Sequence, residues 1–159
     1  MKILVAGGCG FVGAAVCHRL LATRDRLEIT VLDSFRRAGS ETNRATLAAL
    51  GVTVVHGDIR IPADIAAAAA SGRFDWVIDA AAEPSVVAGT AVGSGVTTEQ
   101  LVDHNLIGTF HLLEAAARWN AGVILLSTSR VYSIPALLTV PLRVRSTDGG
   151  EAFVIDESQ

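Results

Sequence analysis

Aromatic residues and long apolar runs are both scarce in this chain. Only 5% of the 159 residues are aromatic although 50% are hydrophobic, so we expect a core of Ala, Val, Leu and Ile. No apolar run reaches the roughly 18 residues that a membrane-spanning helix needs. Met1 and Lys2 lead directly into an apolar segment without the order of regions of a signal peptide. The sequence therefore predicts neither a membrane-spanning helix nor a membrane partner.

The chain also lacks a strong charge bias and a metal-binding pattern. Its net charge is −3 and its acidic and basic residues are mixed, so we expect no nucleic-acid partner. Cys9 and Cys17 are eight residues apart and fit neither a metal site nor a disulfide framework. His104 and His111 would share a helix face, but no carboxylate or thiol set completes a metal site. We expect no metal, and a reducing, cytoplasmic location.

A glycine-rich turn near the start carries the first functional signal. The apolar run from Lys2 to Ala6 predicts a strand that stops in a Gly-Gly-Cys-Gly-Phe-Val-Gly turn and leads into a helix. The first glycine of a Gly-x-x-Gly-x-x-Gly set would make the tight turn, the second would admit phosphate oxygens, and the third would let the helix pack. The helix start would offer N–H groups to a dinucleotide pyrophosphate, the alternative being a purely structural turn. The residues expected to contact the cofactor here are Gly7, Gly10, Phe11, Val12 and Gly13.

An acidic residue follows the second predicted strand. The run from Leu27 to Leu32 reads as a strand, and Asp33 ends it, twenty residues after Gly13. A carboxylate there would accept the hydroxyls of the adenosine ribose and repel a 2′-phosphate, which favours NAD over NADP. Arg36 and Arg37 follow closely and would soften this preference, because a guanidinium suits a 2′-phosphate. The alternative for Asp33 is a turn-forming role after a strand.

Strands and helices are predicted to alternate along the whole chain. Near-continuous apolar strands separated by helices predict an α/β fold of the Rossmann type, a doubly wound parallel sheet with its ligand at the carboxyl ends of the strands. A loop is expected from Ala88 to Gly95. The predicted strands are 2–6, 27–32, 52–56, 74–78 and 122–126, and the predicted helices are about 11–24, 40–50, 62–71 and 98–120.

With these motifs in order, the chain resembles the N-terminal part of an extended short-chain dehydrogenase/reductase, the group of nucleotide-sugar epimerases and dehydratases. The resemblance implies that Asp58 and Ile59 contact the adenine and that Asn105 holds backbone near the nicotinamide. The alternative for Asn105 is a capping or surface role. The matching segments are Gly7–Gly13, Asp58–Ile59, Asn105–Thr109, Leu113–Ala116 and Ser127–Tyr132.

Several segments resemble the CDP-paratose 2-epimerase branch of that group in particular. They are residues 37–43, 55–60, 81–86 and 127–138. The resemblance implies an NAD-dependent isomerase that acts on a CDP-sugar. Hydride would pass from a sugar carbon to NAD, leaving a transient ketone, and would then return to the opposite face.

The same resemblance assigns site residues at the ends of the fourth and fifth strands. Thr128 would be the catalytic residue that bonds the reacting hydroxyl, although strand-end capping is the alternative for this serine/threonine triplet. Ser129 and Arg130 stand where dehydratase relatives carry an acidic pair, which argues against dehydration. Ala80, Ala81 and Ala82 would line the cofactor, and Glu83, Ser85 and Ser129 would face the substrate. For Glu83 a plain loop role is an equal alternative.

One catalytic element of the family is missing from the chain. The family's general acid/base is a Tyr followed four residues later by a Lys, but the single Tyr, Tyr132, is followed by Ala136. We therefore expect an incomplete NAD-binding domain over residues 1–140, with a polar, turn-rich tail over 141–159 that leads toward a missing substrate-binding part. Such a chain would bind NAD without epimerising a sugar. A catalytically inactive NAD-sensing module and a piece of a related dehydratase or reductase remain alternatives. The resemblance also implies a homodimer that would use the helix from Thr98.

Overall fold

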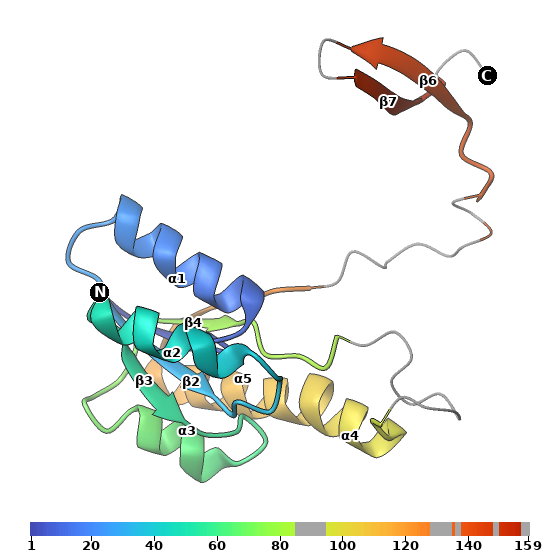
Figure 1. The fold of residues 1–159 in the computed structure, drawn as a ribbon. Coiled ribbons are helices and arrows are strands. Elements are labelled where there is room, and N and C mark those ends of the chain that lie inside the picture. The colour runs from blue at the N-terminus through green and yellow to red at the C-terminus, as the bar shows by residue number, and fades with distance from the viewer. Residues whose placement is uncertain (85–94, 128–134, 136–137, 148–149, 157–159) are drawn as a thin grey trace. The chain divides into compact units, whose positions relative to one another are not determined.

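The computed structural model describes residues 1–84, 95–127, 135, 138–147 and 150–156. The chain forms two compact units, residues 1–126 and residues 127–159, and each is described by itself. Figure 1 labels their helices and strands along the chain. None of the described helices is both long enough and apolar enough to cross a membrane.

The first unit is built on a five-stranded parallel sheet. Its strands are β1 (Lys2–Ala6), β2 (Glu28–Asp33), β3 (Thr53–His56), β4 (Trp76–Asp79) and β5 (Gly122–Leu125). They lie in the order β3-β2-β1-β4-β5, so β1 is central and pairs with β2 on one side and β4 on the other. The strand order reverses at β1, and this switch point is where parallel sheets bind ligands. The predicted α/β doubly wound sheet is confirmed.

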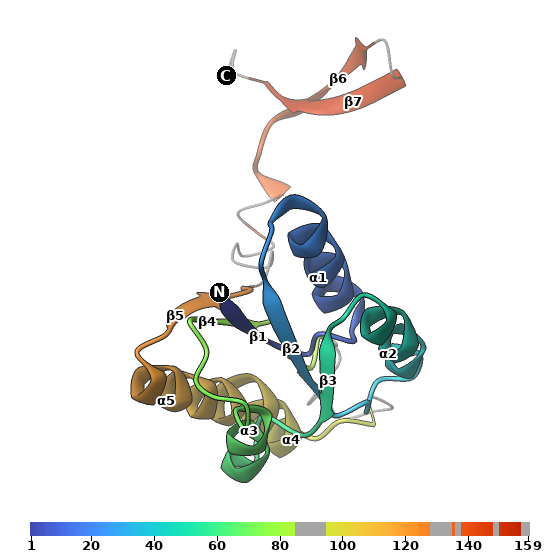
Figure 2. The same cartoon turned by 90° about the vertical axis from the view of Figure 1, so that its left-hand side faces the viewer.

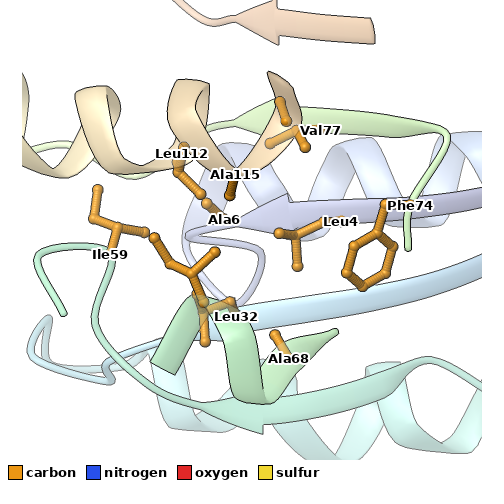
Figure 3. Close-up of a cluster of buried hydrophobic side chains, with 11 residues drawn as sticks. Leu4, Ala6, Leu32, Ile59, Ala68, Phe74, Val77, Leu112 and Ala115 are labelled. Atoms are coloured by element: carbon orange, nitrogen blue, oxygen red, sulfur yellow. The ribbon is translucent and has the colours of Figure 1, made fainter. Parts of the chain in front are cut away.

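Helices cover both faces of this sheet, as Figure 2 shows. One face carries α1 (Phe11–Thr23) and α2 (Ser40–Ala49), and the other carries α3 (Pro62–Ala68) and α5 (Thr109–Trp119). Successive β1 side chains point to opposite faces, so Leu4 joins one core and Val5 the other. Figure 3 shows the core under α3 and α5, which is mostly aliphatic and includes Phe74, against whose ring Trp119 packs edge-on with the ring centroids 5.3 Å apart. Aliphatic residues therefore dominate the core, as composition predicted.

Two predicted helices differ from the structure. The third helix ends at Ala68, not Ser71, because the chain tightens into turns in which Ala70 and Gly72 donate to carbonyls three residues back. The predicted helix 98–120 is three consecutive pieces. These are α4 (Thr98–Val102), the π-helix η1 (Asp103–Gly108) and α5.

The start of this helical segment is fixed by a capping box. The Thr97 side chain accepts from the Gln100 backbone N–H at 3.1 Å, and the Gln100 side chain accepts from the Thr97 N–H at 3.1 Å. This arrangement satisfies two of the N–H groups that a helix start leaves unpaired. The helix thus begins directly after Thr97, at the start that the sequence predicts.

The second unit contains a β-hairpin that the sequence analysis did not predict. Strands β6 (Leu142–Thr147) and β7 (Gly150–Ile155) pair antiparallel, with Leu142 opposite Ile155 and Val144 opposite Phe153. In β6, Leu142 and Val144 alternate with Arg143 and Arg145, whereas β7 ends in the consecutive apolar residues Phe153, Val154 and Ile155. The many polar and charged residues of the segment 141–159 instead indicated a turn-rich tail.

Candidate functional site

The turn after β1 has the backbone geometry that the glycine spacing predicts. Gly7 adopts a left-handed φ of +68°, and its N–H donates to the Leu32 carbonyl at 2.8 Å. A Cβ at Gly7 would lie 2.8 Å from Ala81 Cα and 2.9 Å from the Ala80 carbonyl carbon. The turn therefore packs directly against the segment that follows β4. A side chain at this position would be excluded both by φ and by space.

The third glycine of the motif is required by the turn itself. A Cβ at Gly13 would overlap the Gly7 carbonyl oxygen and lie 2.7 Å from Gly8 Cα. Helix α1 thus starts in direct contact with the turn. A Cβ at Gly10, in contrast, would meet only the Gly7 carbonyl oxygen, at 3.2 Å. The space in front of Gly10 is open, which suits the approach of a phosphate group.

The N-terminus of α1 faces this open space. Gly10 is the N-cap and supplies no side-chain cap, and the Phe11 side chain is 91% exposed. The first N–H groups of a helix have no partner within it, and the helix dipole adds a positive partial charge there. The glycine cradle and these donors together fit a dinucleotide pyrophosphate.

Asp33 lies at the end of β2, next to the glycine turn, and is 8% exposed. Its Oδ2 accepts from the Cys9 N–H at 2.9 Å, and its Oδ1 accepts from the Phe35 N–H at 2.9 Å. Each oxygen keeps a further acceptor site, because a carboxylate has about four. The structure thus brings Asp33 and the glycine turn together, as predicted, and fixes the orientation of the carboxylate.

Asn43 of α2 is a supporting residue that the sequence analysis missed. Its Nδ2 donates to the Cys9 carbonyl at 2.8 Å, so α2 holds the glycine turn from the outside. In the sequence, Asn43 stands out only as the last residue of the segment 37–43 that resembles the CDP-paratose 2-epimerase branch. Nothing in the local pattern links it to Cys9, which lies 34 residues earlier in the chain.

Asp58 and Ile59, the two residues after β3 that were predicted to contact the adenine, offer different groups to a ligand. The Ile59 side chain is buried in the core shown in Figure 3, so only its backbone is available to a ligand. The Asp58 carboxylate is held by Arg60, whose Nη2 lies 2.6 Å from Oδ2. The hydrogen bonds from Arg60 hold the pKa of Asp58 below its usual range.

The end of β4 carries a buried carboxyl group. Asp79 is 2% exposed, its Oδ2 accepts from the Thr109 hydroxyl at 2.7 Å, and its Oδ1 accepts from the Ala81 N–H at 3.1 Å. Burial raises the pKa of Asp79, and these two hydrogen bonds oppose the shift. The segment Ala80–Ala81 is therefore held between Gly7 and Asp79.

Asn105 holds the next part of the same segment. Its Oδ1 accepts from the Glu83 N–H at 2.8 Å, and its Nδ2 donates to the Glu83 carbonyl at 3.1 Å. Asn105 thus holds the Glu83 backbone, and its predicted place near a nicotinamide stays a prediction. Asn105 lies in η1 and Thr109 starts α5, so the π-helical turn leaves both facing the segment after β4.

Three predicted site residues, Ser85, Thr128 and Ser129, lie outside the residues that the structure describes. Ser127, just before them, is described and exposed. No group of three or more His, Cys, Asp or Glu residues able to hold a metal is found within the described ranges. His111 instead contacts the Ile59 carbonyl at 3.3 Å.

A hollow of about 140 Å³ lies at the opposite end of the sheet. It is lined by Lys2, Leu27, Glu28, Ile29, Thr30, Gly51, Thr53, Ser71 and Phe74. Lys2 and Glu28 begin their strands, whereas ligands of parallel sheets bind at the carboxyl ends. The glycine turn and Asp33 are therefore the better candidate site.

Comparisons with known proteins find a matching family and several similar proteins. A family model described as "NAD dependent epimerase/dehydratase family" matches residues 3–148. The chain is similar to dTDP-glucose 4,6-dehydratase of Mycolicibacterium smegmatis, with 36% identity over 132 residues, and to CDP-paratose 2-epimerase of Salmonella typhi, with 31% over 135. Each match covers 83% of this chain and 38% of the relative's length.

A solved structure is similar as well. The UDP-glucose 4-epimerase of Thermus thermophilus, in complex with NAD, superimposes with a TM-score of 0.62 at 31% identity. The match covers 76% of this chain and 35% of that one. The chain thus spans well under half the length of these relatives.

Proposed function

Since the chain belongs to the NAD dependent epimerase/dehydratase family, we propose that the site formed by the glycine turn and Asp33 binds NAD. The observation that carries the proposal is the contact between these two elements, in which the Asp33 carboxylate accepts the Cys9 N–H of the turn. In this arrangement one ligand can lie on the α1 N-terminus and reach the end of β2.

Each part of the site has a separate task in this proposal. The N–H groups at Phe11, Val12 and Gly13 bind the pyrophosphate, and the open face of Gly10 admits it. Asp33 accepts the ribose hydroxyls, and Asp58 with the Ile59 backbone borders the adenine. On the other side of β1, the segment from Ala80 to Ala82 lines the nicotinamide half, with Asn105 holding its far end through Glu83.

We further propose that the whole protein is a nucleotide-sugar epimerase, most similar to CDP-paratose 2-epimerase, and takes a CDP-sugar. Bound NAD would supply a reversible hydride acceptor at the sugar carbon. Thr128 would bond the reacting hydroxyl, while Glu83, Ser85 and Ser129 would border the sugar. Residues 1–140 would form the cofactor-binding part, and 141–159 would lead to the substrate-binding part.

A second candidate, an NAD-binding module without epimerase activity, is favoured by one observation. Tyr132 is the single Tyr of this sequence and is followed four residues later by Ala136, so the sequence contains no Tyr-x-x-x-Lys pair.

In either case a homodimer through α4, η1 and α5 is supported by the exposed side chains of Leu106, Phe110 and Leu113.

Titration of the chain with NAD by isothermal calorimetry tests the proposed cofactor site. Asp33→Ala should weaken binding by roughly 1.5–3 kcal/mol, the usual worth of a hydrogen bond to a charged group. Asp25→Ala, an exposed carboxylate away from the site, is the matched control and should leave the affinity unchanged. Circular dichroism checks that each variant is folded. If Asp33→Ala does not fold, it is replaced by Asp33→Asn, which keeps an acceptor for one N–H. Equal NAD affinity in the folded wild type and in folded Asp33→Ala would contradict the proposal.

A further inference from the structure

Two residues of opposite charge, Asp33 and Arg36, lie at the end of β2 and just after it, and they suit NAD and NADP respectively. Asp33 ends β2, and Arg36 lies three residues later. A carboxylate at this place favours the 2′-hydroxyl of NAD, whereas a nearby arginine accommodates the 2′-phosphate of NADP. Sequence alone leaves the balance between them open, so the contacts of Arg36 decide which residue reads the ribose.

The Arg36 side chain is engaged by a residue far along the chain. Its Nη1 lies 3.3 Å from Nε2 of His104, which belongs to η1, 68 residues later. The other ring nitrogen, Nδ1, lies 2.7 Å from the Gln100 carbonyl oxygen. A carbonyl only accepts, so Nδ1 carries the hydrogen in the neutral ring and Nε2 is left as an acceptor. Arg36 therefore donates to His104.

No carboxylate competes with His104 for this guanidinium. Across the ranges that the structure describes, Arg36 makes no ion pair, and the carboxylate of Asp58 is paired with Arg60 at 2.6 Å. The two oxygens of Asp33 accept the N–H groups of Cys9 and Phe35 and form no ion pair with Arg36 in the described part of the chain, so they stay open to a ribose hydroxyl. The contact that positions Arg36 is thus the one with His104.

We propose that His104 is a specificity-determining residue of the cofactor site, because it engages Arg36 and leaves Asp33 to read the adenosine ribose. The bond to His104 anchors the Arg36 guanidinium, which keeps its other N–H donors but has to move to reach a 2′-phosphate, and that phosphate also meets the Asp33 carboxylate. NAD meets neither obstacle. This inference rests on the proposed function, and it assigns the choice between NAD and NADP to η1 as well as to the β2 end.

The test compares dissociation constants for NAD and NADP by calorimetry in four variants of the whole chain. His104→Ala frees Arg36, and a hydrogen bond of this kind is worth a factor on the order of two to ten. The ratio of the NADP to the NAD dissociation constant should fall by that factor. His104→Gln keeps an acceptor and should retain the wild-type ratio. Arg36→Ala, and Arg36→Ala combined with His104→Ala, should bind NADP equally weakly.

The readout separates this role from a structural one. Damage to the fold would weaken both cofactors together and leave their ratio constant, whereas release of Arg36 changes the ratio. An unchanged ratio in His104→Ala, with NAD still bound, would overturn the inference and spare the proposed function. A gain in NADP affinity that persists without Arg36 would overturn it too. If the wild-type chain binds no NAD, the proposed function fails first and this inference with it.

Discussion

Replacing Gly7 by alanine should destabilise the first unit more than any other single Gly→Ala change with a similar backbone conformation. Gly7 has φ +68°, and an alanine there pays roughly 1–2 kcal/mol for the left-handed conformation. Its Cβ would also lie 2.8 Å from Ala81 Cα and 2.9 Å from two Ala80 backbone atoms. Overpacking of this kind adds roughly 1–3 kcal/mol, because backbone atoms cannot rotate away as a side chain does.

The expected total is about 2–5 kcal/mol, which corresponds to a fall in Tm of roughly 4–20 °C for a domain of this size. Gly51→Ala is the matched control. Gly51 has φ +83°, and nothing lies within 4 Å of a Cβ built there, so only the conformational cost of about 1–2 kcal/mol applies. The difference between the two variants isolates the contact between the turn and the segment after β4.

Thermal unfolding followed by circular dichroism measures both variants. Folded Gly7→Ala protein should also bind NAD more weakly, since the turn must move away from Ala80 and Ala81. Equal stability losses in Gly7→Ala and Gly51→Ala would refute the argument, because they would show that the turn yields without cost.

Three further predictions concern Asp79, the two cysteines and Asn105. The folded chain binds the Asp79 proton more tightly than the unfolded chain, since burial raises this pKa, so its contribution weakens as pH rises above about 4. In urea unfolding from about pH 4 to 7, the free energy of unfolding should decline less steeply for Asp79→Asn than for the wild type. Identical slopes would count against a raised pKa of Asp79. Burial raises the pKa of Cys9 and Cys17 to about 11, so iodoacetamide at about pH 8 should alkylate the native thiols about a hundredfold more slowly than the unfolded ones. Comparable rates, followed by mass spectrometry, would contradict their burial. Asn105→Ala removes both hydrogen bonds to Glu83, and amide hydrogen exchange at Glu83 should accelerate while β1 stays protected.

The sheet and the glycine turn were predictable because their signals are local. An apolar run of five residues followed by three spaced glycines fixes a strand, a turn and a helix within thirteen residues. Each strand observed in the first unit lies within two residues of its predicted bounds. The position of Asp33 followed from the same local reading, since it only had to end the second strand.

The π-helical turn was not predictable from the sequence. Residues 98–120 keep a helical pattern throughout, so nothing local marks where the turn widens. In the structure, a Cβ at Gly108 would lie 2.5 Å from Ile59 Cδ1, which places this turn against a side chain from a distant segment. Contacts of this kind, like those of Asn43 with Cys9 and of His104 with Arg36, depend on tertiary packing alone.

The strand order also has a consequence for how the sheet grows during synthesis. Of the five strands, β1 leaves the ribosome first and ends at the centre of the sheet. Each later strand then joins an edge that already exists: β2 and β3 extend one side, and β4 and β5 extend the other. No strand has to insert between two that are already paired. The half that holds Asp33 can therefore form against the glycine turn before the segment carrying Asp79 has been made.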